Sequence, residues 1–259
     1  MLYLIGLGLY DEGDISVRGI ETAKKCDIVC AELYTSPWQG SLKTLGGLVG
    51  TDIIELKRAD LEENLKLTIE KAYNKDMTLF VPGDPLVATT HSSVVMEAHL
   101  RGINVEVIHA SSVFSAVAET GLHIYKFGKT ATVAYPEKNF FPKTGYQVLK
   151  ENKKRGLHTL LLLDVKADQN KYMTVNEAIE LLLKLEEMEN ESVFGDDTLC
   201  VGVARLGGDD KKTLIGFGNA KELMKHDFGG PPHVLIVPGE LHFSEEDYLK
   251  NLSLYNQDK

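Results

Sequence analysis

Short apolar runs alternate with helix-length amphipathic segments along almost the whole chain, and this alternation constrains the fold more than any other feature. Strands separated by helices of this length form parallel sheets with helices on their faces, which is the α/β class. The apolar runs in the first part of the chain predict strands at residues 2–8, 28–33, 53–56, 78–81 and 105–108. We therefore expect the chain to begin with a parallel-sheet domain.

Two helix ends in this part have recognisable signals. Asp60 and Glu63 have the spacing of a capping box, which predicts the start of a helix that continues through Tyr73. Gly102 follows the amphipathic segment 91–101 and is suited to a left-handed cap at its end.

The second part of the chain has a different pattern. It predicts strands at residues 130–134, 160–165, 199–207, 213–218 and 233–237. A helix should end near Gly156, Thr174 with Glu177 should open another through a capping box, and Ser244 should cap a terminal helix. The turn-rich sequence GGDDKK indicates that the strands on either side of it are antiparallel. We expect two α/β domains, residues 1–112 with a parallel sheet and residues 113–259 with a mixed sheet.

Composition excludes several classes of protein. The 28 Lys and Arg residues against 38 Asp and Glu give a net charge of −10, which argues against nucleic-acid binding. No apolar run approaches the roughly 20 residues of a membrane span, and the chain does not start with a basic leader, so we expect a cytoplasmic protein. Cys26, Cys30 and Cys200 fit a reducing compartment. We expect Cys26 and Cys30 to be buried thiols on one face of a strand, and we predict no metal site.

Two glycines, Gly6 and Gly8, follow the first predicted strand. A dinucleotide-binding fingerprint needs a third glycine where this chain has Asp11, and no GxxxxGK[ST] motif is present. The glycines alone therefore indicate a turn.

A stronger motif is the sequence LFVPGDPLVATTH, residues 79–91. Gly83 permits a sharp turn after a buried strand, and Pro85 favours an extended Asp84. Asp84 should lie at the carboxyl edge of the parallel sheet, where open α/β folds bind ligands. Asp84 as a simple cap of the following turn is an equally good interpretation.

The segment from Ser111 to Gly121 is typical of a helix N-terminus, with Ser111 or Ser112 as the cap. Its free backbone N–H groups are able to hold a carboxylate. Structural capping alone is the simpler interpretation of these serines.

Taken together, these segments resemble the diphthine synthases, within the tetrapyrrole-methylase-like group of S-adenosylmethionine-dependent methyltransferases. The resemblance is carried by MLYLIGLGL, AELYTS, GDPLVATTH, GLHIYKFG, GLHTLLLLDVK, MTVNEA, DDTLCVGVAR and PPHVLIVPGELHF. The GDP turn alone indicates only the wider group, whereas the combination is more specific. The compact link between Asp164 and Tyr172 is typical of archaeal members.

The resemblance implies a homodimer of two-domain subunits, with S-adenosylmethionine in the cleft between the domains and S-adenosylhomocysteine as the product. The implied substrate is translation elongation factor 2, at a histidine that carries a 3-amino-3-carboxypropyl group. Trimethylation of its amino group gives diphthine. The implied partners include neither nucleic acid nor membrane.

The matching motifs also imply the residues that contact the cofactor. They are Leu9, Asp84, Val87, Ser112, Val113, Leu163, Leu206 and His233. Tyr10 and Leu206 replace smaller residues that are common in the wider group, so contacts there depend on whether these side chains protrude. The resemblance indicates no catalytic base.

Two other functions are compatible with these motifs. The same methyl donor serves enzymes that methylate a corrin or a porphyrin, and a ligand-shaped cleft also occurs in non-catalytic nucleotide-binding modules. Labelling of an acceptor distinguishes an enzyme from a binding module, and the identity of the acceptor distinguishes the two enzymes.

Overall fold

The computed structural model describes residues 1–138, 140–208 and 213–255. The chain divides into two compact units, Met1–Ala116 and Val117–Lys259, and each unit has its own sheet and hydrophobic core. No helix in the described part of the chain is long and apolar enough to cross a membrane.

The first unit is built on a five-stranded sheet in which all neighbouring strands are parallel, as the sequence predicts. In spatial order the strands are β3 (Ile54–Leu56), β2 (Ile28–Glu32), β4 (Met77–Val81), β1 (Leu2–Gly6) and β5 (Val105–Ile108). Every residue of the central strand β4 is buried, because helices cover both faces of the sheet.

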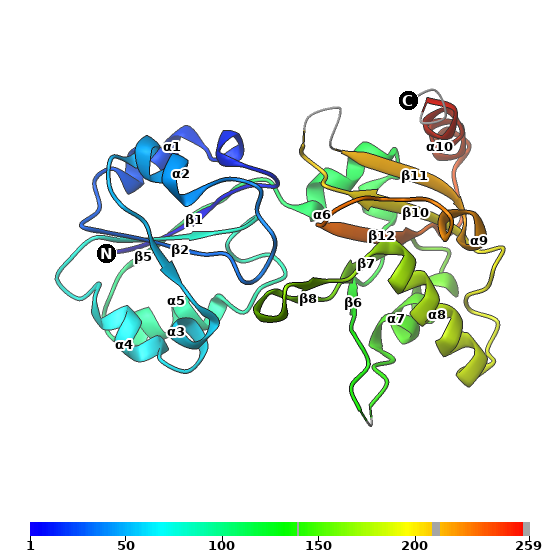
Figure 1. The fold of residues 1–259 in the computed structure, drawn as a ribbon, viewed down its shortest axis with the longest axis horizontal. Coiled ribbons are helices and arrows are strands. Elements are labelled where there is room, and N and C mark those ends of the chain that lie inside the picture. The colour runs from blue at the N-terminus through cyan, green and yellow to red at the C-terminus, as the bar shows by residue number, and fades with distance from the viewer. Residues whose placement is uncertain (139, 209–212, 256–259) are drawn as a thin grey trace. The chain divides into compact units, whose positions relative to one another are not determined.

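Two layers of helices cover this sheet (Figure 1). One face carries α1 (Val17–Ala23) and α2 (Leu42–Val49), and the other carries α3 (Arg58–Glu62), α4 (Leu65–Glu70) and α5 (Ser92–Leu100). The successive residues Leu79 and Phe80 of β4 belong to different core clusters, one for each face. A 3-10 turn, Glu12–Asp14, and the one-turn helix α6 (Val113–Ala116) complete the unit.

Two predicted helix ends in the first unit have different outcomes in the structure. Gly102 has φ +69° after α5, so the left-handed cap is confirmed. The long helix that Asp60 was expected to open is wrong: Asp60 is the third residue of α3, its carboxylate accepts the Lys57 N–H at 2.8 Å, and a second helix starts at Leu65.

The cysteine prediction is wrong in its geometry. Cys30 lies in β2 and is buried in one core cluster, whereas Cys26 precedes the strand, is half-buried and packs against the other cluster. The difference arises because Cys26 belongs to the turn after α1, where its thiol lies 3.4 Å from the Thr22 carbonyl oxygen.

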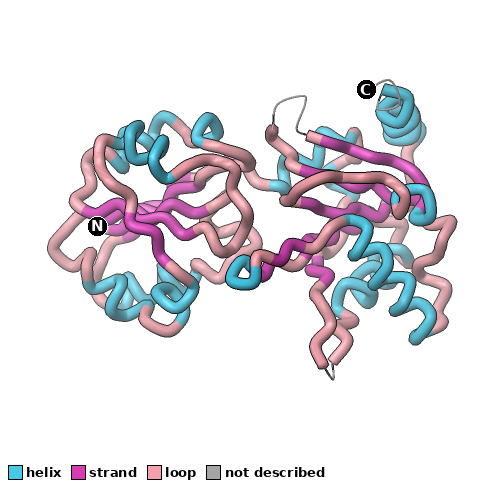
Figure 2. Tube along the Cα trace, viewed as in Figure 1, coloured by secondary structure: helices cyan, strands magenta, loops and turns pink. Residues whose placement is uncertain are grey.

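The second unit has a five-stranded sheet, drawn in magenta in Figure 2, and its strand pairs make it mixed, also as predicted. In spatial order the strands are β11 (Leu214–Asn219), β10 (Leu199–Ala204), β12 (His233–Val237), β7 (Thr159–Leu163) and β6 (Ala131–Val133). Only the β6–β7 pair of this sheet is parallel among the described strands. A separate hairpin joins β8 (Val165–Lys166) to β9 (Lys171–Tyr172).

Side chains of α7 (Thr144–Lys153), α8 (Val175–Glu189) and α9 (Ala220–Leu223) belong to one large core cluster in this unit. The unit also contains α10 (Phe243–Tyr255) and 3-10 turns at Val117–Thr120, Ile124–Lys126 and Ala167–Gln169. The Thr174–Glu177 capping box at the start of α8 is confirmed, as is the antiparallel β10–β11 pair. Most of the GGDDKK turn, residues 209–212, lies outside the described residues.

Ser244 was expected to cap the terminal helix, and this is wrong. Helix α10 already includes Ser244, and the carboxylate of the next residue, Glu245, accepts the His242 N–H at 2.8 Å. As with Asp60, an acidic residue inside the first turn reaches back to the chain that enters the helix.

Candidate functional site

Five of the eight candidate cofactor residues lie at one edge of the first sheet. Leu9 follows β1, Asp84 and Val87 follow β4, and Ser112 and Val113 follow β5. Because β4, β1 and β5 are parallel neighbours, their carboxyl ends meet at the same edge, where open α/β sheets bind ligands. We call this edge the first-unit edge.

Glycines allow the three turns at this edge to approach one another closely. Gly8 and Gly83 exchange two backbone hydrogen bonds, of 3.2 and 2.8 Å, and both have positive φ. A Cβ atom on Gly6 would lie 2.5 Å from the Cβ of Ala110 and 2.6 Å from the carbonyl oxygen of Gly83. The glycines of the first motif therefore serve the packing of the turns that carry the candidate residues.

The Asp84 carboxylate joins two of these turns. It is buried, with 6% of the residue exposed. Its Oδ1 accepts the Leu86 N–H at 3.2 Å, so Asp84 does cap the following turn, which is one of the two roles that the sequence allows. Its Oδ2 lies 2.8 Å from His109 Nδ1 and accepts the Ala110 N–H at 3.4 Å, so the residue also holds the turn after β5. The apolar side chain of Val87 in the same loop is exposed.

The segment after β5 forms less helix than the sequence predicts. The helix α6 has a single turn, ends at Ala116, and is followed by a 3-10 turn rather than by a helix to Gly121. The Ser112 hydroxyl accepts the Phe114 N–H at 3.3 Å, so capping is its structural role. The one-turn length leaves few aligned peptide dipoles for an anion.

The other three candidates lie at one edge of the second sheet. Leu163 ends β7, Leu206 follows β10, and His233 begins β12. Strand β12 is antiparallel to both neighbours, and His233 pairs with Ala204 of β10 while the next residue pairs with Leu162 of β7. We call this edge the second-unit edge. The role of all eight residues in cofactor binding remains a prediction.

The imidazole of His233 is already engaged within the protein. Its Nδ1 accepts the Val175 N–H at 3.3 Å, and its Nε2 lies 2.9 Å from the Gly230 carbonyl oxygen, so Nε2 carries the proton. Burial lowers the pKa of this histidine, which keeps it neutral. A ligand contact at His233 would therefore use its backbone.

Tyr10 and Leu206, which stand where smaller residues are common in the wider group, are both buried, so neither side chain protrudes.

A buried pair in the first unit was not predicted from the sequence. Glu32, the last residue of β2, and His91, which precedes α5, are 0% and 1% exposed, and Glu32 Oε1 lies 3.6 Å from His91 Nε2. Burial raises the pKa of Glu32 to about 7 and lowers that of His91 to about 4. Both residues lie within segments that carry the family resemblance, AELYTS and GDPLVATTH, which was the only signal for them.

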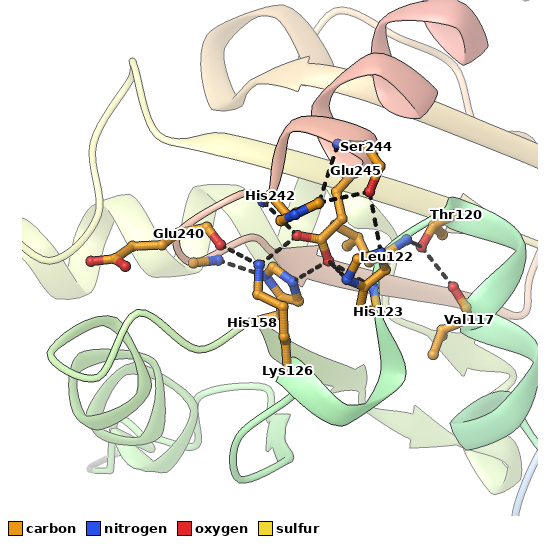
Figure 3. Close-up of polar contacts among 11 residues, drawn as sticks. Val117, Thr120, Leu122, His123, Lys126, His158, Glu240, His242, Ser244 and Glu245 are labelled. Atoms are coloured by element: carbon orange, nitrogen blue, oxygen red, sulfur yellow. Dashed lines mark hydrogen bonds and ion pairs between the residues drawn. The ribbon is translucent and has the colours of Figure 1, made fainter.

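A second buried cluster, centred on Glu245, lies in the second unit (Figure 3). The Glu245 carboxylate accepts the backbone N–H groups of His123 and His242, the Lys126 ammonium at 2.5 Å and His158 Nε2 at 2.9 Å. Burial alone would raise its pKa, but these donors hold it at about 2. His158 precedes β7 while Leu163 ends it, so the cluster lies at the opposite end of that strand from the second-unit edge.

Among the described residues, no group of three or more His, Cys, Asp or Glu side chains is arranged to hold a metal ion. Asp84 and Ser112 bond to groups of the first unit, and His233 bonds to the backbone of the second unit. The first-unit edge thus offers a buried carboxylate, main-chain groups and exposed apolar side chains, which is the composition of a site for a small organic ligand.

Comparison with known proteins gives a consistent result. The family model of the tetrapyrrole (corrin/porphyrin) methylases matches residues 1–223. The chain is 46% identical to the diphthine synthase of Methanocaldococcus jannaschii, over 97% of this chain and 98% of that protein. It is also 46% identical to the diphthine synthase of Methanococcus maripaludis strain C7, with the same coverage.

The structural comparison agrees with the sequence comparison. A crystal structure of diphthine synthase superposes with a TM-score of 0.87 at 38% identity and covers 97% of this chain and 95% of that one. Since the relatives match almost from end to end, this chain belongs to the tetrapyrrole methylase family and, within it, to the diphthine synthases.

Proposed function

We propose that this protein transfers methyl groups from S-adenosylmethionine to the amino nitrogen of the 3-amino-3-carboxypropyl-histidine of translation elongation factor 2, and that three transfers give diphthine. Membership of the family supports the reaction. The observation that carries the proposed donor site is the first-unit edge, where the turns after three neighbouring strands meet and a buried Asp84 joins two of them.

The residues of this edge fit the chemistry of the donor. S-adenosylmethionine presents an adenine ring, ribose hydroxyls and a sulfonium cation. Leu9 and Val113 are half-buried and Val87 is exposed, so all three have apolar surface available for the adenine. The Asp84 carboxylate supplies a hydrogen-bond acceptor and a negative charge. At the second-unit edge, Leu163, Leu206 and the backbone of His233 are the proposed contacts.

The chemistry requires little from the protein beyond orientation. When bound, the donor supplies an electrophilic methyl group, and the transfer moves one positive charge from sulfur to nitrogen. An α-amino group has a pKa near 8, so about a tenth of it is neutral and nucleophilic at pH 7. Holding the two reactants in line is worth more than a strong base in such a reaction. After three transfers the nitrogen has no lone pair, and N-methylation stops.

Two further properties belong to the proposal: the active protein is a homodimer, and it works in the cytoplasm. Sedimentation of the purified chain at micromolar concentration tests the first property. Fractionation of cells of the source organism tests the second.

The decisive experiment combines the chain, S-adenosylmethionine and purified elongation factor 2 that carries the unmethylated precursor. Mass spectrometry of the modified peptide should show three added methyl groups. No mass gain with a competent substrate contradicts the proposal, and gain on a corrin or porphyrin instead would indicate tetrapyrrole methylation.

The donor site is tested separately with Asp84→Ala. We expect the Kd for S-adenosylmethionine to rise about tenfold, the effect of losing one charge-assisted contact. Asp52→Ala, at an exposed position before β3, is the matched control. An unchanged Kd in Asp84→Ala contradicts the assignment.

A further inference from the structure

The loop that joins β4 to α5, residues 83–90, carries two of the proposed donor contacts, Asp84 and Val87, and contains no helix or strand. Ala88 within it has φ +55°, a left-handed conformation that a residue other than glycine adopts at a cost. Such a conformation persists only where the surroundings hold the loop at both ends. The first end is held by the Gly8–Gly83 hydrogen bonds and by Asp84.

The second end of the loop is held by His91. Its backbone N–H donates to Thr89 Oγ1 at 3.2 Å, and its Nδ1 contacts the same hydroxyl. When the Thr89 hydroxyl donates its proton to Nδ1, the imidazole carries its own proton on Nε2. This Nε2 is fully buried and has no hydrogen-bond partner.

The group that faces this Nε2 is the carboxyl of Glu32. Oε1 of Glu32 lies 3.6 Å away and accepts the Thr35 hydroxyl at 2.6 Å, while Oε2 accepts the N–H groups of Tyr34 and Thr35. Glu32 is therefore fixed by its own turn, the AELYTS segment. The cation that acts on it is Arg58, whose guanidinium lies 5.0 Å from the centre of the Tyr34 ring.

We infer that Glu32 and His91 are positioning residues for methyl-donor binding: the contact between Oε1 and Nε2 anchors the far end of the 83–90 loop to the turn after β2, and thereby sets the position of Asp84 and Val87. The separation of 3.6 Å exceeds an ordinary N–H···O bond of about 2.9 Å. A small movement of the loop converts it into a hydrogen bond and gives the buried N–H a partner, which couples this contact to occupancy of the loop. The inference rests on the proposed function.

The test measures the Kd for S-adenosylhomocysteine, a stable probe, by calorimetry. His91→Leu removes the N–H, and we expect its Kd to rise about tenfold. His91→Gln, which restores a donor near the position of Nε2, should bind within about threefold of the original chain. Glu32→Gln should weaken binding about fivefold and serves as the second test if His91→Leu does not fold. His99→Leu, at an exposed position of α5, and Glu55→Gln, at an exposed position of β3, are the matched controls.

The kinetic readout separates positioning from a general loss of fold. In the methylation assay the variants should raise KM for the methyl donor, while KM for the elongation factor and kcat stay within about twofold. Binding by His91→Leu and Glu32→Gln within twofold of the original chain would overturn the inference. If the original chain itself does not bind the probe, the proposed function fails instead, so the two failures are distinguishable.

Discussion

Among the described residues, each unit contains one carboxylate that is fully buried in a polar cluster, and the two behave in opposite ways. Glu32 in the first unit and Glu245 in the second are both 0% exposed. The pKa of Glu32 is raised by burial to about 7, whereas that of Glu245, despite its burial, is held at about 2 by its donors. Both carboxylates are shielded from solvent, but Glu32 lies deeper in the protein and Glu245 has more donors, so depth and partners together set the charge.

The partners differ in charge and in origin. Glu32 accepts from its own turn, through Tyr34 and Thr35, and faces a neutral imidazole. Glu245 accepts from three separate segments, one of which supplies the Lys126 ammonium. The fully paired cluster fixes the start of α10, far along the sheet from the candidate residues. The Glu32–His91 pair, in which His91 Nε2 has no hydrogen-bond partner, lies beside the candidate donor loop. Incomplete hydrogen bonding of this kind is expected where local stability is given up for ligand binding.

The largest expected effect comes from Glu245→Ala. It leaves Lys126, His158 and two backbone N–H groups without their acceptor in a buried site, and we expect a loss of about 4 kcal/mol in the free energy of unfolding. Urea unfolding at pH 7 measures it. Glu246→Gln is the matched control, because the neighbouring ion pair with Lys250 is exposed and should contribute little. Equal stability of the two variants would contradict a role for the Glu245 cluster in stability.

The next effect is on the pH dependence of stability. The raised pKa of Glu32 means that the folded chain binds more protons than the unfolded one between pH 4.5 and about 7, so stability falls as pH rises through this window. The lowered pKa of His91 has the opposite effect, with stability falling as pH drops from 6.5 towards about 4. In the original chain the two slopes oppose each other where the windows overlap.

Replacing one residue of the pair should reveal the pH dependence of stability that the other residue causes. In Glu32→Gln, unfolding stability should increase with pH between about 4 and 6.5, and in His91→Gln it should decrease between about 4.5 and 7, each by about 3 kcal/mol. Urea unfolding at half-unit intervals of pH is the measurement, with His99→Gln as the control. If the free energy of unfolding depends on pH in the same way in both variants and in the control, Glu32 and His91 do not titrate as described.

A smaller change should follow from Lys126→Met, which removes the cation that distinguishes the two carboxylates. Glu245 keeps its His158 and backbone donors, so we expect a loss of about 2 kcal/mol at pH 7. The pKa of Glu245 should also rise. The acid loss of stability, which for a lowered pKa occurs as pH falls from 4.5 towards about 2, should then be smaller and end at a higher pH. An acid unfolding midpoint that does not move contradicts the role given to Lys126.

The smallest change is expected for Thr35→Val. It removes the hydroxyl that donates to Glu32 at 2.6 Å and should cost about 1 kcal/mol. Because this hydroxyl stabilises the charged form, the pKa of Glu32 should rise further, and the fall in stability should extend to higher pH. Thr44→Val, at an exposed position of α2, is the control. No difference between the two would mean that the hydroxyl does not determine the charge of Glu32.

The sequence predicts most of the architecture because the signals for strands are local and periodic. The position of Asp84 at the edge of the first sheet is predicted by three successive local signals: a buried strand, a glycine and a proline. The helix starts at Asp60 and Ser244 were misplaced because in both helices the capping carboxylate lies inside the first turn and reaches back. The Glu32–His91 pair joins segments far apart in the sequence, and no local spacing encodes such a contact.

The most direct test of the account is a crystal structure of the chain with S-adenosylhomocysteine. We expect the adenosyl group at the first-unit edge, in contact with the turns after β1, β4 and β5 that carry Leu9, Asp84 and Ser112. Ligand density away from these turns, such as beside Glu245, would contradict it.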